Sequence, residues 1–150
     1  MKITAILIAC LIGTTQAPAL AASAEMKAPC RLEVDNAHLS SNIVKKEKKL
    51  AVKVIFRSIC NFDQENLIVV VQIKKGGLVG DHAVTPPITR RFPFVNANQE
   101  SLIQDIYVYC KNTKRTYFYG IAEAEAYVNE IRVKAPKAQS RKRVALECGT

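Results

Sequence analysis

Four cysteines of this 150-residue chain lie in phase with the apolar faces of alternating segments. Successive side chains of a β-strand point to opposite faces of a sheet, so residues two apart share a face. In the segment that ends at Cys60, Lys53 and Arg57 lie on one face. The other face carries a nearly continuous apolar row: Leu50, Val52, Val54, Phe56, Ser58 and Cys60. Cys30, Cys110 and Cys148 likewise lie on the apolar face of their own segments. The pattern predicts strands whose cysteines are buried between sheets.

The N-terminus predicts a secretory signal peptide over residues 1–24. Lys2 precedes an apolar run at residues 3–13, and small residues follow it up to Glu25. That run has the length of a signal core, whereas crossing a bilayer takes about 20 apolar residues. We expect cleavage before Glu25, or after Ala21 as an alternative, which leaves an exported domain over residues 25–150. An uncleaved anchor and lipoprotein processing at Cys10 are further alternatives.

In an exported chain, the four remaining cysteines predict two disulfides. A metal site is disfavoured because no two of these cysteines lie within five residues of each other in the sequence, and no histidine accompanies them. Four cysteines allow three pairings. We favour Cys30–Cys60 and Cys110–Cys148, each worth on the order of 3–4 kcal/mol in the chain-entropy model. The crossed pairings stay open.

Alternating segments continue along the chain and predict an all-β fold. The strand expected at 67–74 is apolar on both faces, which indicates a central position, and Pro86-Pro87 favours an edge position for a weaker strand at 83–92. We expect loops at 36–49, 111–115 and 131–142, and no helix. The other expected strands are 30–35, 50–60, 102–110, 116–128 and 143–148. Together they predict an immunoglobulin-like antiparallel two-sheet sandwich with two disulfides.

The segment from Cys30 to Ser40 contains Asp35-x-x-His38-x-Ser40, and alternating strands that end at Cys60 and begin at Leu67 follow it. This part, residues 30–73, resembles small secreted actinobacterial β-sandwich proteins of unknown function with paired cysteines. The present chain has more Lys, and less Ser, Gly and Trp, than those proteins. The resemblance implies export, a sandwich and disulfides, and it carries no activity with it.

The chain is basic, with a formal net charge of +9. Without residues 1–24 it has 21 basic and 13 acidic residues, a net charge of +8. This charge favours anionic partners, and basic loops near aromatic rings can bind phosphate-rich polymers. The candidate binding residues are Lys45, Lys46, Lys48, Lys49, Arg90, Arg91, Lys114, Arg115, Tyr117 and Tyr119. We expect an anionic envelope polymer or another secreted or surface protein as the partner, and not nucleic acid. Charge that only aids solubility is the alternative.

The Asp35, His38 and Ser40 side chains invite comparison with a catalytic triad. A nucleophilic triad holds its base between two partners in three dimensions, whereas these three residues crowd one strand end. We therefore interpret them as turn residues that bond to nearby backbone.

A second catalytic hypothesis rests on Glu123 and Glu125, which share a strand face about 7 Å apart, a separation in the range of glycosidase carboxylates. Tyr119 and Tyr127 flank them. A secreted glycan hydrolase that uses Glu123 or Glu125 with His82 is therefore one alternative function. An exported inhibitor or immunity-type protein that blocks an enzyme with a basic loop is another. We expect a non-catalytic binding role, with no cofactor and no metal.

Overall fold

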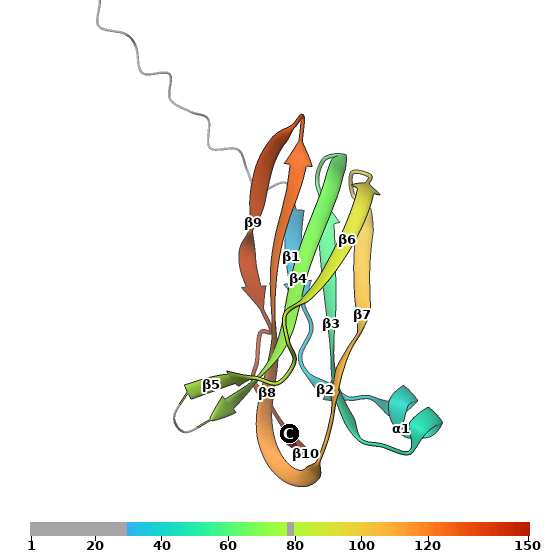
Figure 1. Cartoon of the computed structure of the whole chain (residues 1–150), viewed down its shortest axis with the longest axis vertical. Coiled ribbons are helices and arrows are strands. Elements are labelled where there is room, and N and C mark those ends of the chain that lie inside the picture. The colour runs from blue at the N-terminus through green and yellow to red at the C-terminus, as the bar shows by residue number, and fades with distance from the viewer. Residues whose placement is uncertain (1–29, 78–79) are drawn as a thin grey trace, which may run out of the picture.

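The computed structural model describes residues 30–77 and 80–150, so the predicted signal peptide and Cys10 lie outside the described residues. Most strands run along the long axis of the molecule (Figure 1). In chain order the elements are β1 (Cys30–Val34), β2 (His38–Leu39), α1 (Ser41–Glu47), β3 (Ala51–Cys60), β4 (Gln64–Gly77), β5 (Gly80–Ala83), β6 (Ile88–Val95), β7 (Glu100–Tyr109), β8 (Asn112–Val128), β9 (Ile131–Gln139) and β10 (Val144–Gly149).

The first sheet is centred on β3. Along one edge of β3, β1 pairs with residues 56–60 and β2 pairs with residues 52–53, so β1 and β2 lie end to end. β7 pairs with the opposite edge, and all these pairings are antiparallel. The sheet therefore has three strand positions, and β7 forms one of its edges.

The second sheet is centred on β4 and β8, which pair over the longest antiparallel ladder of the described residues. β10 and β9 lie end to end along the outer edge of β8. β6 and β5 lie end to end along the outer edge of β4. The central position predicted for the strand at 67–74 is confirmed. This sheet has four strand positions and packs face to face against the first.

The core lies between the sheets and comes from the alternating faces of three strands. The predicted alternation is confirmed in β3 from Val52 to Cys60 and in β8 from Phe118 to Ala126, where every second residue is buried. The largest buried apolar side chains include Val52, Val54 and Phe56 of β3, Leu67, Val69, Val71 and Ile73 of β4, and Phe118 of β8. Within this row β8 carries Gly120, which lets the two sheets approach closely: a Cβ atom there would lie 2.6 Å from Val54 Cγ1 and 2.8 Å from Val34 Cγ1.

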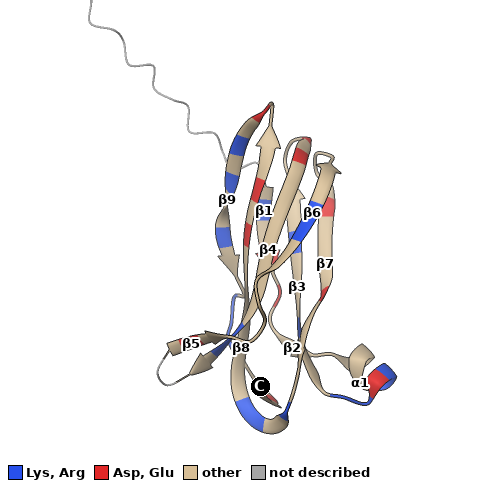
Figure 2. Ribbon diagram, viewed as in Figure 1, with Lys and Arg blue, Asp and Glu red and all other residues tan. Residues whose placement is uncertain are grey.

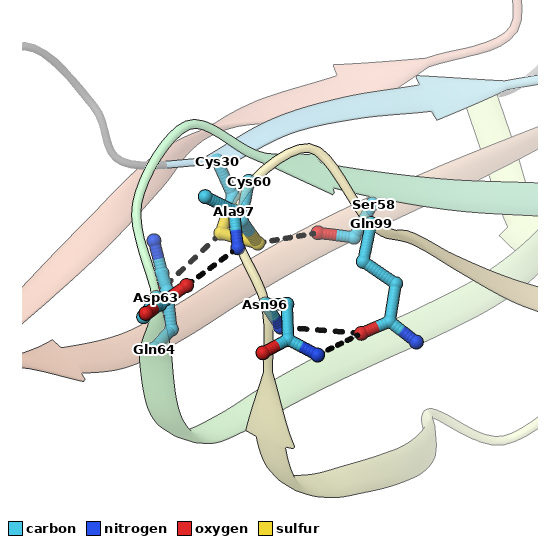
Figure 3. The surroundings of a disulfide bond; sticks show 8 residues. All are labelled: Cys30, Ser58, Cys60, Asp63, Gln64, Asn96, Ala97 and Gln99. Atoms are coloured by element: carbon cyan, nitrogen blue, oxygen red, sulfur yellow. Dashed lines mark hydrogen bonds between the residues drawn. A yellow bond between two sulfur atoms is a disulfide. The ribbon is translucent and has the colours of Figure 1, made fainter.

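The predicted disulfide pairing, Cys30–Cys60 and Cys110–Cys148, is confirmed. The prediction that all four cysteines are buried between the sheets holds for Cys30, Cys60 and Cys148, which belong to the core, and is wrong for Cys110. The two bonds differ in what they connect. Cys30 and Cys60 are directly opposite residues of β1 and β3, so their bond lies within one sheet, where it contacts buried Gln64 (Figure 3). Cys110–Cys148 connects the end of β7 in one sheet to β10 in the other. Cys110 itself is only partly buried.

The antiparallel two-sheet sandwich is confirmed, whereas the immunoglobulin-like topology is not. Antibody domains carry an inter-sheet disulfide between their second and sixth strands. Here the cysteine of β3 bonds to β1 in its own sheet. The strand after β4 and β5 also stays beside β4 and does not join the sheet of β7.

Two of the segments predicted as loops or turns are strands. β8 already begins at Asn112, so Lys114 and Arg115 are strand residues. β9 occupies most of the predicted loop at 131–142. It forms because Asn129 and Glu130, with φ of 48° and 65°, make the two-residue turn with positive φ that matches the twist of a hairpin.

The prediction of no helix is also wrong, because α1 forms within the loop predicted at 36–49. The Ser40 hydroxyl caps its N-terminus by accepting a hydrogen bond from the Ile43 amide, at 3.4 Å. Lys48 ends the helix in the left-handed conformation. No helix of the described residues is long and apolar enough to cross a membrane.

The close approach at Gly120 yields a stability prediction. Gly120→Ala should lower the free energy of unfolding by about 1–3 kcal/mol, because the added methyl group overpacks the contact with Val54 and Val34. Gly76→Ala is the matched control, since its Cβ would meet no atom closer than 3.6 Å. Denaturant unfolding of both oxidised variants measures the difference. Equal stability of the two would show that the sheets can separate at Gly120 without cost.

Candidate functional site

Away from one end of the sandwich, many acidic side chains form ion pairs with lysine or arginine side chains. On the outer face of the β8–β9 hairpin, glutamates of β8 bind cations of β9, and other pairs join β6 to β7 and surround β3 (Figure 2). The pairs are Lys137–Glu123, Arg132–Glu125, Arg90–Asp105, Arg57–Asp35 and Arg57–Glu100.

Basic side chains gather at the end of the sandwich where α1, the β4–β5 hairpin and the start of β8 lie, drawn at the bottom of Figures 1 and 2. We call this the basic end. It carries a concave surface of about 640 Å³, which we call the basic groove. The residues that line it come from β4, β8, β10 and their connections: Lys75, Gly76, Gly77, Asn112, Lys114, Arg115, Thr116, Tyr117, Arg143, Gly149 and Thr150.

Four cations thus line one groove, and three of them form no ion pair with an acidic side chain of the described residues. Within residues 30–77 and 80–150, no ion pair engages Lys75, Lys114 or Arg115. Glu147 of β10 is opposite Arg115 in the strand register, but no ion pair joins the two side chains. Tyr117 also lines the groove, and 55% of its surface is exposed. Its neighbour across the sheet is Gly76, which has no side chain to cover the ring.

The fourth cation, Arg143, is held in place by Asp81 and Tyr119. Its guanidinium lies 4.9 Å from the centre of the Tyr119 ring and donates to Asp81 Oδ2 at 2.7 Å. The Tyr119 hydroxyl donates to the same carboxylate oxygen, at 2.9 Å. Burial and this hydrogen bond raise the pKa of Tyr119 above its ordinary value. Tyr119 is 6% exposed, so it supports Arg143 and presents little surface to a ligand.

The backbone beneath the groove is fixed by the second disulfide. Cys110–Cys148 bonds the residues just before Lys111 and Gly149, and the Lys111 amide donates to the Gly149 carbonyl at 2.7 Å. Any side chain on Gly149 would clash with the Asn112 amide, so the chains approach closely here. The Lys75 ammonium donates to the Thr150 carbonyl oxygen at 2.8 Å. One covalent bond therefore ties β7, β8 and β10 together at the groove.

The structure brings together only part of the predicted binding residues. Lys114, Arg115 and Tyr117 line the basic groove. Arg90 is paired to Asp105, and Arg91 lies on β6 opposite Ile68, eight residues along β4 from Gly76 and therefore about 26 Å away.

The remaining predicted residues are Lys45 and Lys46 in α1, with Lys48 and Lys49 directly after it. They lie at the basic end, outside the basic groove. Lys75 and Arg143, which complete the groove, were not predicted. Their closeness to Tyr117 depends on strand register, which the sequence does not display.

The residues of the hydrolase alternative do not form one site: Glu123 and Glu125 line the same hollow, whereas His82 lies apart from them. The hydrogen bond from Lys137 lowers the pKa of Glu123, whereas a glycosidase acid needs a raised one. Glu123 is opposite Val70, and His82 is opposite Lys75, so they are five residues apart along β4, about 17 Å.

The three residues of the possible triad each have other partners. The Asp35 carboxylate binds Arg57, and His38 Nδ1 lies 3.3 Å from the Asn36 carbonyl oxygen. Ser40 is buried as the cap of α1. Within the described parts of the chain, no group of three or more His, Cys, Asp or Glu residues could hold a metal ion.

No known protein-family model matches the chain, and no curated protein matches its sequence. The properties of the site therefore rest on its own geometry.

The Cys110–Cys148 bond yields a prediction that a matched pair of variants can test. Cys110→Ser/Cys148→Ser and Cys30→Ser/Cys60→Ser open loops of 38 and 30 residues, so each should lose on the order of 3–4 kcal/mol of stability. Amide hydrogen exchange should nevertheless quicken at Lys111 mainly in the first variant, because only that bond holds the Lys111–Gly149 contact. Equal exchange at Lys111 in both variants would contradict this role.

Proposed function

We propose that this protein is exported and acts as a non-catalytic binding protein, with the basic groove holding an anionic polymer of the cell envelope. The proposal is carried by four cations, Lys75, Lys114, Arg115 and Arg143, that line one groove together with the exposed Tyr117. Export is supported by the features of residues 1–24 and by the two disulfides, which persist in oxidising compartments.

The chemistry of the groove suits oxyanions. A guanidinium presents a planar fork of donors that matches a phosphate, and lysines add flexible point charges. Arg143 is already oriented by Asp81 and Tyr119, so binding costs it little side-chain entropy. The open Tyr117 ring adds an apolar face on which a sugar or polyol can rest. The groove is built on paired strands and a disulfide, a support rigid enough to hold these groups in position.

The other proposed functions have less support. A glycan hydrolase would need Glu123 or Glu125 free, and both are held by cations of β9. An exported inhibitor would insert a basic loop into an enzyme, whereas Lys114 and Arg115 belong to a strand. An open groove lined by several cations fits a flexible anionic polymer better.

The proposal predicts that removing two cations of the groove weakens polymer binding more than removing two cations elsewhere on the surface. Lys114→Gln/Arg115→Gln should weaken binding of the oxidised protein to purified teichoic acid by roughly tenfold to hundredfold, through lost charge-assisted hydrogen bonds. The slope of log K against log salt concentration should also fall by about 2. Isothermal titration over a salt series measures both quantities.

Arg91→Gln/Lys134→Gln is the control, because it removes the same charge from exposed cations outside the groove. It should change affinity by less than about threefold. Glu147→Gln, which removes the carboxylate opposite Arg115, should strengthen binding. Equal weakening by both double variants would show that binding depends on net charge alone. Unchanged binding in the groove variant would refute the proposal.

A further inference from the structure

A second concave surface adjoins the basic groove and shares two residues with it. It has a volume of about 340 Å³, and Tyr109 and Lys111 line it, as do Lys75 and Thr150. Lys75 and Thr150 also line the basic groove, where the Lys75 ammonium reaches the Thr150 carbonyl oxygen. The two hollows therefore meet at one cation and one carbonyl group, and Lys75 is accessible from both sides.

The far side of the second surface leads to the lysines at α1. The Lys49 ammonium lies 5.4 Å from the centre of the Tyr109 ring, and the Tyr109 hydroxyl donates to Glu47 of α1. That hydrogen bond raises the pKa of Tyr109 above its usual range, so its hydroxyl adds no negative charge. Glu47 accepts this hydrogen bond and remains an exposed carboxylate. From the second hollow onward, Lys111, Lys49 and the other lysines at α1 therefore outnumber the one carboxylate among them.

From these contacts we infer that the basic end carries one continuous track, from Arg115 through Lys75 and Lys111 to Lys49, and that its ligand is a linear phosphodiester polymer without bases. This inference rests on the proposed function and deepens it. A single anion would occupy the basic groove alone. A polymer with a charge on every repeat would place successive phosphates along the whole track.

The aromatic side chains favour a polymer without bases. Non-specific binding of single-stranded nucleic acid uses several rings on which successive bases stack. In the described track, Tyr117 is the one tyrosine with most of its surface exposed. Tyr109 is contacted by Lys49 on its ring, by Glu47 at its hydroxyl and by the edge of Tyr107, with ring centres 5.3 Å apart. The described track therefore offers cations at several points along its length, but only one largely exposed aromatic ring on which a base could stack.

The test compares two ligand lengths with variants in the two halves of the track. The probes are a glycerol phosphate trimer and poly(glycerol phosphate), titrated into the full oxidised protein. Lys114→Gln/Arg115→Gln alters the near half, and Lys49→Gln/Lys111→Gln alters the far half. The near-half variant should weaken binding of both probes. The far-half variant should weaken binding of the long polymer by about tenfold and leave the trimer within about twofold.

The outcomes separate the inference from the proposed function. If the far-half variant leaves the long polymer unaffected while the near-half variant weakens it, the groove stands and the track is refuted. If the wild-type protein binds neither probe, the proposed function fails as well. Single-stranded DNA of equal charge should bind more weakly than poly(glycerol phosphate), and tighter binding of the DNA would overturn the polymer class. The altered residues are exposed, and circular dichroism verifies that each variant is folded.

Discussion

The covalent bond between Cys110 and Cys148 is the constraint on which the basic end depends. It joins the two sheets at the connection between β7 and β8, directly beneath the groove. The neighbouring contacts of Lys111 with Gly149 and of Lys75 with Thr150 require these strand ends to stay together. The Cys30–Cys60 bond joins neighbouring strands that already form a ladder, so it adds stability without connecting the sheets. The two bonds close loops of similar length and serve different parts of the fold.

Charge is separated along the molecule by strand pairing. β9 places its lysine and arginine side chains beside the glutamates of β8, and each pair reduces the field on the outer face of that sheet. Exposed pairs of this kind add little stability, so their main effect is on where the net charge lies. The cations of the basic groove have one carboxylate bound among them, Asp81, and that carboxylate orients Arg143. The result is a positive end on a scaffold where six other acidic residues of the described chain are paired: Glu33, Asp35, Glu100, Asp105, Glu123 and Glu125.

The sequence was sufficient for the features that repeat locally. The alternation of β3 and β8 and the phase of the cysteines predicted the sandwich and two disulfides. The favoured pairing is the one observed, although the sequence left the crossed pairings open. Sequence patterns did not predict β9, whose basic segment is a strand because β8 supplies partners for it. They also did not predict α1, because the local Ser40 cap was interpreted as part of a turn. For the site, Lys114, Arg115 and Tyr117 were found, but Lys75 and Arg143 were not. Their place beside Tyr117 follows from the register of Gly76 with Tyr117 and from the Asp81 contact.

We propose that an anionic polymer binds along one path over the basic end. Amide and side-chain NMR of the isotope-labelled, oxidised protein, titrated with poly(glycerol phosphate), tests this path residue by residue. We expect chemical-shift changes at Tyr117, Arg115, Lys75, Lys111 and Lys49, with little change on the outer face of β9. Changes spread evenly over Arg91, Lys134 and the basic end would contradict it, because they would show attraction to net charge without a defined site.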